Sequence, residues 1–513
     1  LELETRRGQA PDSRDTASIR LETEPMATAA RPVDTGDIAS QRSHSAPAGV
    51  SEWLRTHTRC LLSLVGLTVA LYLPTLGYDF VNWDDPWYVV NNPLIKSWQP
   101  SNLYALATQA AVRNYAPATL FSFLVDHTLW GLWAGGFHLT NLLLHALNAA
   151  LVYALVVRLT HSRWTAWATA ALFAVHPVQI ETVAWISSRK GLLSATFILA
   201  ALMCWLRPKR SGRAEAWGLA FFALALLSKA IAVVVPAVVL LYDVLVRRET
   251  LAVALPRQVI PGFLSVLLLL ATMSAQSGST GGVREHLTLS QAEILAVDAV
   301  ILWRYAGMLA WPADLCVLYD PPAKGIALPA AVGGTAWLAV AVLLWRSRKR
   351  RPMPTWAAAT CLLFLLPVLN LFPITTLMND RYLYLPSVAA FGLFAAALHR
   401  LPAVWKASGL ESRCAFRGGV PRNLTVAAML ICYGMMAHAH LPVWRDGLSL
   451  WGHAAAEAPR LAAARIELAN ALHAAGRDDA AVRVLHGALR DCPADELDRA
   501  RIERKLGEWA GPR

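Results

Sequence analysis

The chain has 513 residues, of which 56% are hydrophobic and only 16% are charged. A soluble domain carries about a quarter charged residues, so this composition excludes an ordinary soluble protein and indicates a chain that folds in lipid. The net charge is +12, with 47 Lys and Arg against 35 Asp and Glu. Because the basic residues gather between apolar runs, the charge indicates membrane orientation and no nucleic-acid partner.

Residues 1–57 are polar and rich in Arg, Ser, Thr and Pro, and they show no periodicity. This composition predicts a disordered cytoplasmic tail. The chain begins with Leu1, and Met26 is a candidate start, which would make residues 1–25 an annotation artefact. No A-x-A cleavage pattern follows the first apolar run, so we interpret that run as a retained anchor.

Apolar runs near the roughly 20 residues that cross a hydrocarbon core recur along the chain. They predict an all-α, polytopic helical membrane protein whose transmembrane domain covers residues 58–442. The runs are 60–76, 139–157, 164–186, 192–206, 217–246, 259–275, 327–345, 355–372, 385–398 and 424–441.

The charges of the loops orient these runs. The segment 79–137 holds Lys96 and Arg113 against four acids, whereas later loops are basic, most densely in "RSRKRR" at 346–351. The positive-inside pattern therefore predicts a cytoplasmic amino terminus, an outer loop at 79–137 and a periplasmic carboxyl terminus. We expect a multi-pass protein of the bacterial inner membrane.

Two runs complicate the count. The run 217–246 is too long for one crossing and holds Lys229 near its middle, so we expect a hairpin that turns there. The stretch 298–319 has no free crossing, and we expect an irregular helix at the outer interface. The sum is about eleven spans and one interfacial helix.

The seven cysteines are scattered without a C-x-x-C pair, and the fourteen histidines lack ligand spacing. We therefore predict no metal site and no required cofactor. The adjacent acids Asp84 and Asp85 could hold a divalent ion, although nothing in the pattern requires one.

Polar groups recur at the outer ends of the runs. Because ionisable groups at membrane depth are costly and mark functional sites, we expect them to line one outward-facing cavity. They are Asp84, Asp85, Asn114, Tyr115, His176, Glu181, Arg189, Lys190, Lys229, Asp380, Arg381 and Tyr382.

Such a cavity could transfer a sugar from a lipid-linked phosphate. A carboxylate can take the proton of an acceptor hydroxyl, and negative charge stabilises an oxocarbenium-like state. Cations would then stabilise the departing phosphate. The structural alternatives stay open: Asp85 before Pro86 is typical of a turn, Arg189 and Lys190 of interfacial anchors, and His176 before Pro177 of a helix end.

Residues 443–513 are rich in Ala, Arg, Glu and Leu, and Pro459 and Pro493 lie 34 residues apart. This is the tetratricopeptide (TPR) period, with about one and a half repeats. An amphipathic helical hairpin without a ligand is the alternative.

The strings "FVNWDDPWYVVNNP", "ALFAVHPVQIETVAWISSRKGLLS", "ALLSKAIAVVVPAVVLLYDVL" and "MNDRYLYLPSVAAFGLF" follow one another in this order. Together with "GFHLTNLLLHALNAALVYALV" they resemble the transmembrane-and-TPR O-mannosyltransferases and their bacterial relatives, which are C-type (GT-C) glycosyltransferases. The resemblance covers about residues 60–510.

This resemblance implies inverting transfer of a mannose-like sugar from a polyprenyl phosphate to a protein Ser or Thr hydroxyl, with an acceptor docked by the TPR segment. Asp84 or Asp85 would be the base, and Arg189, Lys190, Lys229 and Arg381 would bind the lipid phosphate. The chain departs from the family pattern at Ala116, Gly191 and Ala230, where bacterial relatives commonly have His, often an acid, and usually Pro. Three other readings remain: glycosylation of a lipid or envelope polymer, a non-enzymatic TPR scaffold, and a transporter.

Overall fold

The computed structural model describes residues 50–110, 114–277, 289–321, 325–370, 376–407, 420–492 and 496–509. The chain divides into two units, Leu1–Thr56 and His57–Arg513. All regular elements of the described residues are helices. Most of the predicted tail 1–57 lies outside the described residues, as does Pro493.

Seven helical segments of the described residues are long and apolar enough to cross a membrane. They confirm an all-α, polytopic membrane protein, while the number of eleven crossings stays a prediction. The segments are Glu52–Gly77, Ala134–Thr160, Ile186–Trp205, Leu251–Met273, Ala327–Ser347, Asp380–Leu401 and Val420–Trp444; the apolar segments Ala230–Val246 and Pro352–Val368 are shorter.

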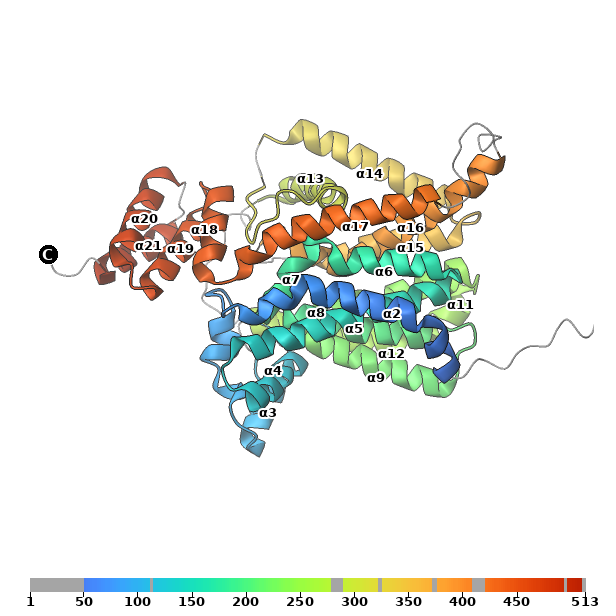
Figure 1. Ribbon diagram of the computed structural model, residues 1–513, viewed down its shortest axis with the longest axis horizontal. Coiled ribbons are helices and arrows are strands. Elements are labelled where there is room, and N and C mark those ends of the chain that lie inside the picture. Colours follow the sequence, from blue (N-terminus) through green and yellow to red (C-terminus); the bar gives the residue numbers. More distant parts are fainter. Residues whose placement is uncertain are drawn as a thin grey trace, which may run out of the picture. The chain divides into compact units, whose positions relative to one another are not determined.

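Three helices form the centre of the bundle: α5 (Ala134–Thr160), α6 (Arg163–Val175) and α8 (Arg189–Trp205) (Figure 1). Both α6 and α8 pack against α5. α9 (Gly212–Ser228) packs on α8, and α16 (Tyr384–Ala407) packs on α6. The apolar window of Ile186–Trp205 is 67% buried in the protein, against 11% for α14 (Ala327–Ser347). α8 is therefore interior, and α14 exposes an apolar surface suited to lipid.

The run 164–186 is not one helix, so the prediction of a continuous span there is wrong. α6 ends at Val175, and His176 takes an extended conformation (φ −66°, ψ 133°) before Pro177. Proline disfavours the α conformation in the residue before it, which accounts for this break. After α7 (Ile180–Ala184), a second break falls at Trp185 (φ −84°, ψ 117°), and α8 follows a 3₁₀ turn. Nearly every side chain between the breaks is buried.

The hairpin in 217–246 is confirmed. α9 ends at Ser228, Lys229 is extended (φ −160°, ψ 139°), and a 3₁₀ turn leads into α10 (Val235–Leu241). In the predicted interfacial stretch, α13 (Gln291–Ala310) is a continuous helix that a capping box of Ser290 and Glu293 begins. Its place at the interface stays a prediction.

The loop predicted to lie outside, residues 79–137, contributes most of a small core. A π-helical turn (Pro86–Val90), α3 (Pro100–Thr108) and α4 (Pro117–Trp130) follow one another. Tyr88 and Phe123 are fully buried in this core, together with Ile186 from the start of the α8 region. The loop is thereby held against the breaks that precede α8.

After α17 (Val420–His440), four helices pack in succession: α18 (Gly447–Glu457), α19 (Ala462–Ala474), α20 (Asp478–Asp491) and α21 (Glu496–Trp509) (Figure 1). Their mutual core includes Ile466, Leu485 and Ile502. The TPR assignment of this segment stays a prediction.

Candidate functional site

The loop acid Asp84 reaches the start of α8. The Lys190 ammonium lies 3.3 Å from Asp84 Oδ2, and both side chains keep some exposure, 12% and 23%. The ammonium also lies 4.7 Å from the centroid of the Tyr88 ring, close enough for a cation–π contact. An accessible carboxylate paired with an ammonium is an arrangement that can exchange protons with a bound hydroxyl.

Asp85, the next residue, has a different environment. It is 1% exposed, and its carboxyl accepts hydrogen bonds from the backbone N–H of Val81 (3.0 Å), from the backbone N–H of Ser187 (3.0 Å) and from the Ser187 hydroxyl (2.5 Å). Burial raises the pKa of the Asp85 carboxyl to about 6, because desolvation of the charge outweighs these hydrogen bonds. Asp85 therefore ties the loop to the second break before α8, and Asp84 is the acid that remains accessible.

Arg189 is fully buried and engages an acid from α4. Its Nη2 lies 2.7 Å from Asp126 Oδ2 and donates to the backbone carbonyl of Phe137 (2.8 Å), and its Nε donates to Asn141 Oδ1. The guanidinium is thus neutralised inside the protein. That Arg189 binds a lipid phosphate stays a prediction, and its burial against Asp126 does not favour it.

Arg381 is the second residue of the Asp380–Leu401 segment and pairs with Glu181 of α7. Its Nη1 contacts Glu181 Oε1, and its backbone N–H donates to Oε2 (2.7 Å). Asp84 lies within electrostatic range of the same guanidinium. Beside it, Asp380 is buried and accepts a hydrogen bond from the Tyr319 hydroxyl (2.5 Å), and Tyr382 contacts the Thr376 hydroxyl (3.1 Å).

Lys229 completes the group of cations. It lies within electrostatic range of Lys190, Arg381 and Glu181, and its Nζ is 3.8 Å from where a Cβ on Gly191 would stand. In the part of the chain that the structure describes, no acid lies within ion-pair distance of this ammonium. Of the four predicted cations, Lys229 is therefore the one without an ion-pair partner among the described residues.

The remaining predicted residues are at the edge of this group. The Asn114 side chain hydrogen-bonds with Tyr88, which in turn contacts Lys190, whereas the Tyr115 hydroxyl donates to the carbonyl of Ala107 (2.8 Å). His176 is fully buried, with its ring 4.4 Å from that of Tyr433 and its Nδ1 accepting from the Val178 N–H (3.3 Å). His176 thus closes a helix end, as the structural alternative expected.

Trp185 is a member of the site that the sequence analysis did not identify. Its indole is 1% exposed and lies 5.6 Å from Lys190 Nζ and 5.2 Å from Arg381 Cζ. The ring is therefore within cation–π distance of both cations. No periodicity or spacing distinguishes Trp185 from the other tryptophans, and the second break before α8, where it stands, has no local signal in the sequence.

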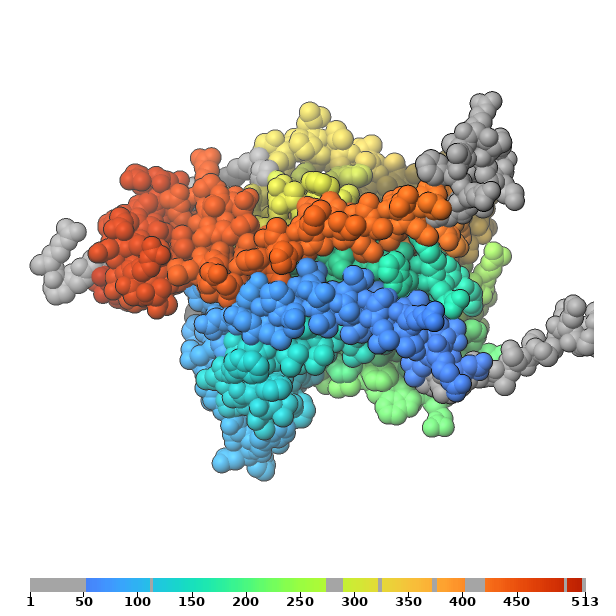
Figure 2. Space-filling view, viewed as in Figure 1, coloured from blue at the N-terminus to red at the C-terminus, as the bar shows by residue number. Residues whose placement is uncertain are grey.

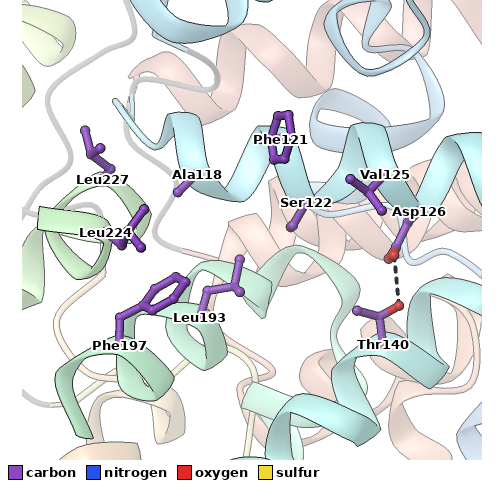
Figure 3. Close-up of a pocket in the computed structure, with 10 residues that line it drawn as sticks. All are labelled: Ala118, Phe121, Ser122, Val125, Asp126, Thr140, Leu193, Phe197, Leu224 and Leu227. Carbon is purple, nitrogen blue, oxygen red and sulfur yellow. Dashed lines mark hydrogen bonds between the residues drawn. The ribbon is translucent and has the colours of Figure 1, made fainter. Parts of the chain in front are cut away.

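A pocket of about 460 Å³ lies among α4, α5, α8 and α9 (Figure 3). Its wall is apolar except at Ser122, at Thr140 and at Asp126, whose Oδ1 accepts from the Thr140 hydroxyl (2.8 Å). Asp126 thus connects the pocket wall to Arg189. Lys190, the residue after Arg189, pairs with Asp84 of the loop. The lining residues are Ala118, Phe121, Ser122, Val125, Asp126, Thr140, Leu193, Phe197, Leu224 and Leu227.

Among the described residues, no group of three or more His, Cys, Asp or Glu side chains is arranged to hold a metal ion. The Asp85 carboxyl is occupied by hydrogen-bond donors, and the Asp84 carboxylate faces a cation. The prediction that the site requires no metal stays a prediction.

No protein-family model matches the chain. Three curated proteins are similar to parts of it. A protein O-mannosyl-transferase of Caenorhabditis elegans is 34% identical over 156 residues, which are 28% of this chain and 22% of that protein. One of Mus musculus is 33% identical over 159 residues (29% and 17%), and one of Drosophila melanogaster is 33% identical over 196 residues (35% and 21%).

The chain is similar to protein O-mannosyl-transferases over about a third of its length. The resemblance predicted from the motifs is thereby confirmed over these segments. The matched segments span about a fifth of the length of the curated relatives, so they do not carry the whole proteins' activity over to this chain.

Two solved structures have a similar arrangement over most of the chain. ArnT from Cupriavidus metallidurans aligns with a TM-score of 0.45 at 14% identity, over 80% of this chain and 81% of that one. The Archaeoglobus fulgidus oligosaccharyltransferase aligns with a TM-score of 0.44 at 13% identity, over 77% and 56%. Both TM-scores lie below 0.5, so neither neighbour assigns a residue or a substrate to this chain.

Proposed function

We propose that the chain is a membrane glycosyltransferase that moves a sugar from a polyprenyl-phosphate donor to a protein hydroxyl at the outer face of a bacterial inner membrane. The observation that carries the proposal is the pairing of the accessible Asp84 with Lys190 beside the unpaired ammonium of Lys229. The curated relatives are named protein O-mannosyl-transferases, which supports a mannose-like sugar and a Ser or Thr acceptor.

In this proposal Asp84 is the base. The acceptor oxygen attacks the anomeric carbon of the sugar, its proton passes to the Asp84 carboxylate, and the bond from that carbon to the phosphate oxygen breaks. The phosphate leaves with the electron pair. Attack from the face opposite the leaving group inverts the anomeric configuration.

The cations stabilise the departing lipid phosphate. Lys229 supplies the charge that no described acid neutralises, and Lys190 can exchange part of its contact with Asp84 for a phosphate oxygen. Arg381 is already paired with Glu181, and we expect it to orient the site more than to bind the phosphate. The apolar pocket at α4 and α9 is suited to an isoprenoid chain, which needs apolar walls and few polar groups.

The test is transfer by the purified protein in nanodiscs, with synthetic polyprenyl-phosphate mannose as donor and Ser/Thr peptides as acceptors, read by mass spectrometry. Asp84→Asn is expected to lower kcat by at least roughly 100-fold, the usual contribution of a general base. Asp79→Asn is the matched control, since it changes an exposed acid of the same loop.

Transfer by Asp84→Asn at the wild-type rate would show that the base is elsewhere. If the sugar were found on a lipid or polymer and not on the peptide, the acceptor would be a component of the cell envelope. If the wild-type protein left the donor intact with every sugar and acceptor tried, the proposed function would be wrong and the non-enzymatic scaffold would be favoured.

A further inference from the structure

The helices after α17 reach into the loop that carries Asp84. Trp451 of α18 is fully buried, and its ring is stacked on that of Trp83 at 4.6 Å with an interplanar angle of 28°. Trp83 directly precedes Asp84. The carboxyl-terminal helices, in orange-red, lie against the light-blue outer loop on the face that Figure 2 shows.

Three further contacts join the same two segments. The backbone N–H of Asp79 donates to the carbonyl of Arg445 (2.9 Å), and the Asn82 side chain donates to the carbonyl of Glu467 (3.4 Å). α18 begins so close to the loop that a Cβ on Gly447 would lie 2.0 Å from Asn82 Oδ1. Residues 79–83 are therefore fixed from the carboxyl-terminal side at their first, fourth and fifth positions.

The same side also contacts the indole of Trp185, which lies near both cations. Trp444, in the 3₁₀ turn after α17, is stacked on Trp185 at 6.0 Å and 27°, and the edge of Trp83 meets Trp185 at 6.4 Å and 78°. Trp185 in turn lies beside Lys190 and Arg381. The tryptophans thus form a continuous path from α18 to the acid and to the cations of the site.

From these contacts we infer that Trp451 is a positioning residue, which holds Asp84 against Lys190 through its stack on Trp83. The carboxyl-terminal helices are then a structural part of the transfer site and not only a docking element. The inference rests on the proposed function, because it assigns Trp451 to the alignment of the proposed base. It differs from that function in making the segment after residue 443 necessary for the geometry of the loop.

The physical reason is the precision that proton transfer requires. Asp84 has one contact of its own with α8, the 3.3 Å ion pair, and this partly exposed pair is weak on its own. Aromatic stacking buries a large apolar surface and fixes ring orientation, so it restricts the backbone of the preceding residue more than the ion pair does. A displacement of about 1 Å in a catalytic group can cost roughly 100-fold in rate.

The experiment compares Trp451→Ala with two controls in the same helices. Trp509→Ala removes another stacked ring, which lies on His473, and Leu485→Ala opens the core that these helices share. The two readouts are amide hydrogen exchange of residues 79–90 in nanodiscs and the separate values of kcat and donor KM.

For Trp451→Ala we expect roughly tenfold faster exchange in 79–90 and a kcat lowered roughly tenfold or more, with donor KM little changed. Trp451→Phe should recover most of both, because it keeps a stacked ring. The controls should change neither the exchange of 79–90 nor kcat.

Unchanged exchange of 79–90 in Trp451→Ala would overturn the inference while leaving the proposed function intact. Equal losses in all three alanine variants would overturn it as well, because they would show a general need for folded helices. If Trp451→Ala does not fold, Gly447→Ala tests the same junction by displacing Asn82. The exchange readout needs no enzyme activity, so a failure of the proposed function is seen separately as absence of transfer by the wild-type protein.

Discussion

The side chains of Arg189 and Lys190, neighbours in the chain, pair with acids on two different elements. Arg189 Nη2 lies 2.7 Å from Asp126 of α4, and Lys190 Nζ lies 3.3 Å from Asp84 of the outer loop. The first pair is almost fully buried, and the second keeps contact with solvent. The buried pair of Arg189 and Asp126 is therefore suited to a structural role, and the accessible pair of Lys190 and Asp84 to contact with a substrate.

The accessible pair predicts the behaviour of Lys190 variants. Lys190→Met removes the ammonium that faces Asp84, and kcat/KM for transfer should fall by roughly 100-fold, as for loss of one charge-stabilising group in other active sites. Lys190→Arg should lose less, because the charge is kept while the geometry changes. The measurement is steady-state transfer in nanodiscs, with Lys209→Met as control because Lys209 is exposed and lies after α8. Equal rates for Lys190→Met and wild type would remove Lys190 from the site.

The buried pair predicts the behaviour of Asp126 variants. Asp126→Leu leaves the Arg189 charge buried without its acid, and it should destabilise the folded protein by about 3–5 kcal/mol. The double variant Asp126→Leu/Arg189→Met should recover most of this loss, because both charges are then absent. Unfolding in detergent by increasing SDS measures these differences.

Thr140→Val is the matched control for this pair. It removes the hydrogen bond to Asp126 Oδ1 and leaves both charges, so it should cost about 1 kcal/mol. If the double variant were as unstable as Asp126→Leu, the ion pair would not explain the loss.

Asp85 predicts a dependence of stability on pH. Its folded pKa of about 6 lies above the ordinary value of an aspartate, so the folded state holds the proton more tightly than the unfolded state does. The stabilisation is therefore present below about pH 4 and is lost as the pH rises through about 6. Melting temperatures are measured in detergent at roughly evenly spaced pH values from 4.5 to 7.5. As the pH rises, the melting temperature of the wild type should fall relative to that of Asp85→Asn. A constant difference between the two proteins across this range would show that Asp85 does not titrate there.

The fold follows from the sequence to the extent that hydropathy and single residues determine it. The hairpin at Lys229 was predictable because the run 217–246 is too long for one crossing and an ammonium is costly in its middle. The break after α6 had a local signal in His176–Pro177, and a long apolar run around it outweighed that signal. The second break, at Trp185, has no such residue and depends on packing.

The site was predictable in its members more than in their roles. Charge and position select Asp84, Asp85, Arg189 and Lys190, but the partner of each is set by elements far away in the chain. Adjacent side chains in a helical turn point about 100° apart, so Asp84 and Asp85 cannot share one environment. The partner of Arg189, Asp126, stands among apolar residues of α4 and becomes conspicuous only when α4 packs on α5.

Gly191 gives the last prediction, because the family that the motifs resemble often has an acid at this position, where this chain has glycine. A Cβ at this position would meet Thr182 Cγ2 at 3.6 Å and Lys229 Nζ at 3.8 Å, which are ordinary contacts. Gly191→Asp therefore fits, and it places a carboxylate beside the ammonium that we propose for the lipid phosphate. Donor KM should rise roughly tenfold, the equivalent of about 1.4 kcal/mol in binding, because the new anion competes with the phosphate. Gly191→Asn has nearly the same shape without the charge, so it should leave KM close to the wild-type value, and equal KM values for the Asp and Asn variants would mean that Lys229 does not bind the donor phosphate.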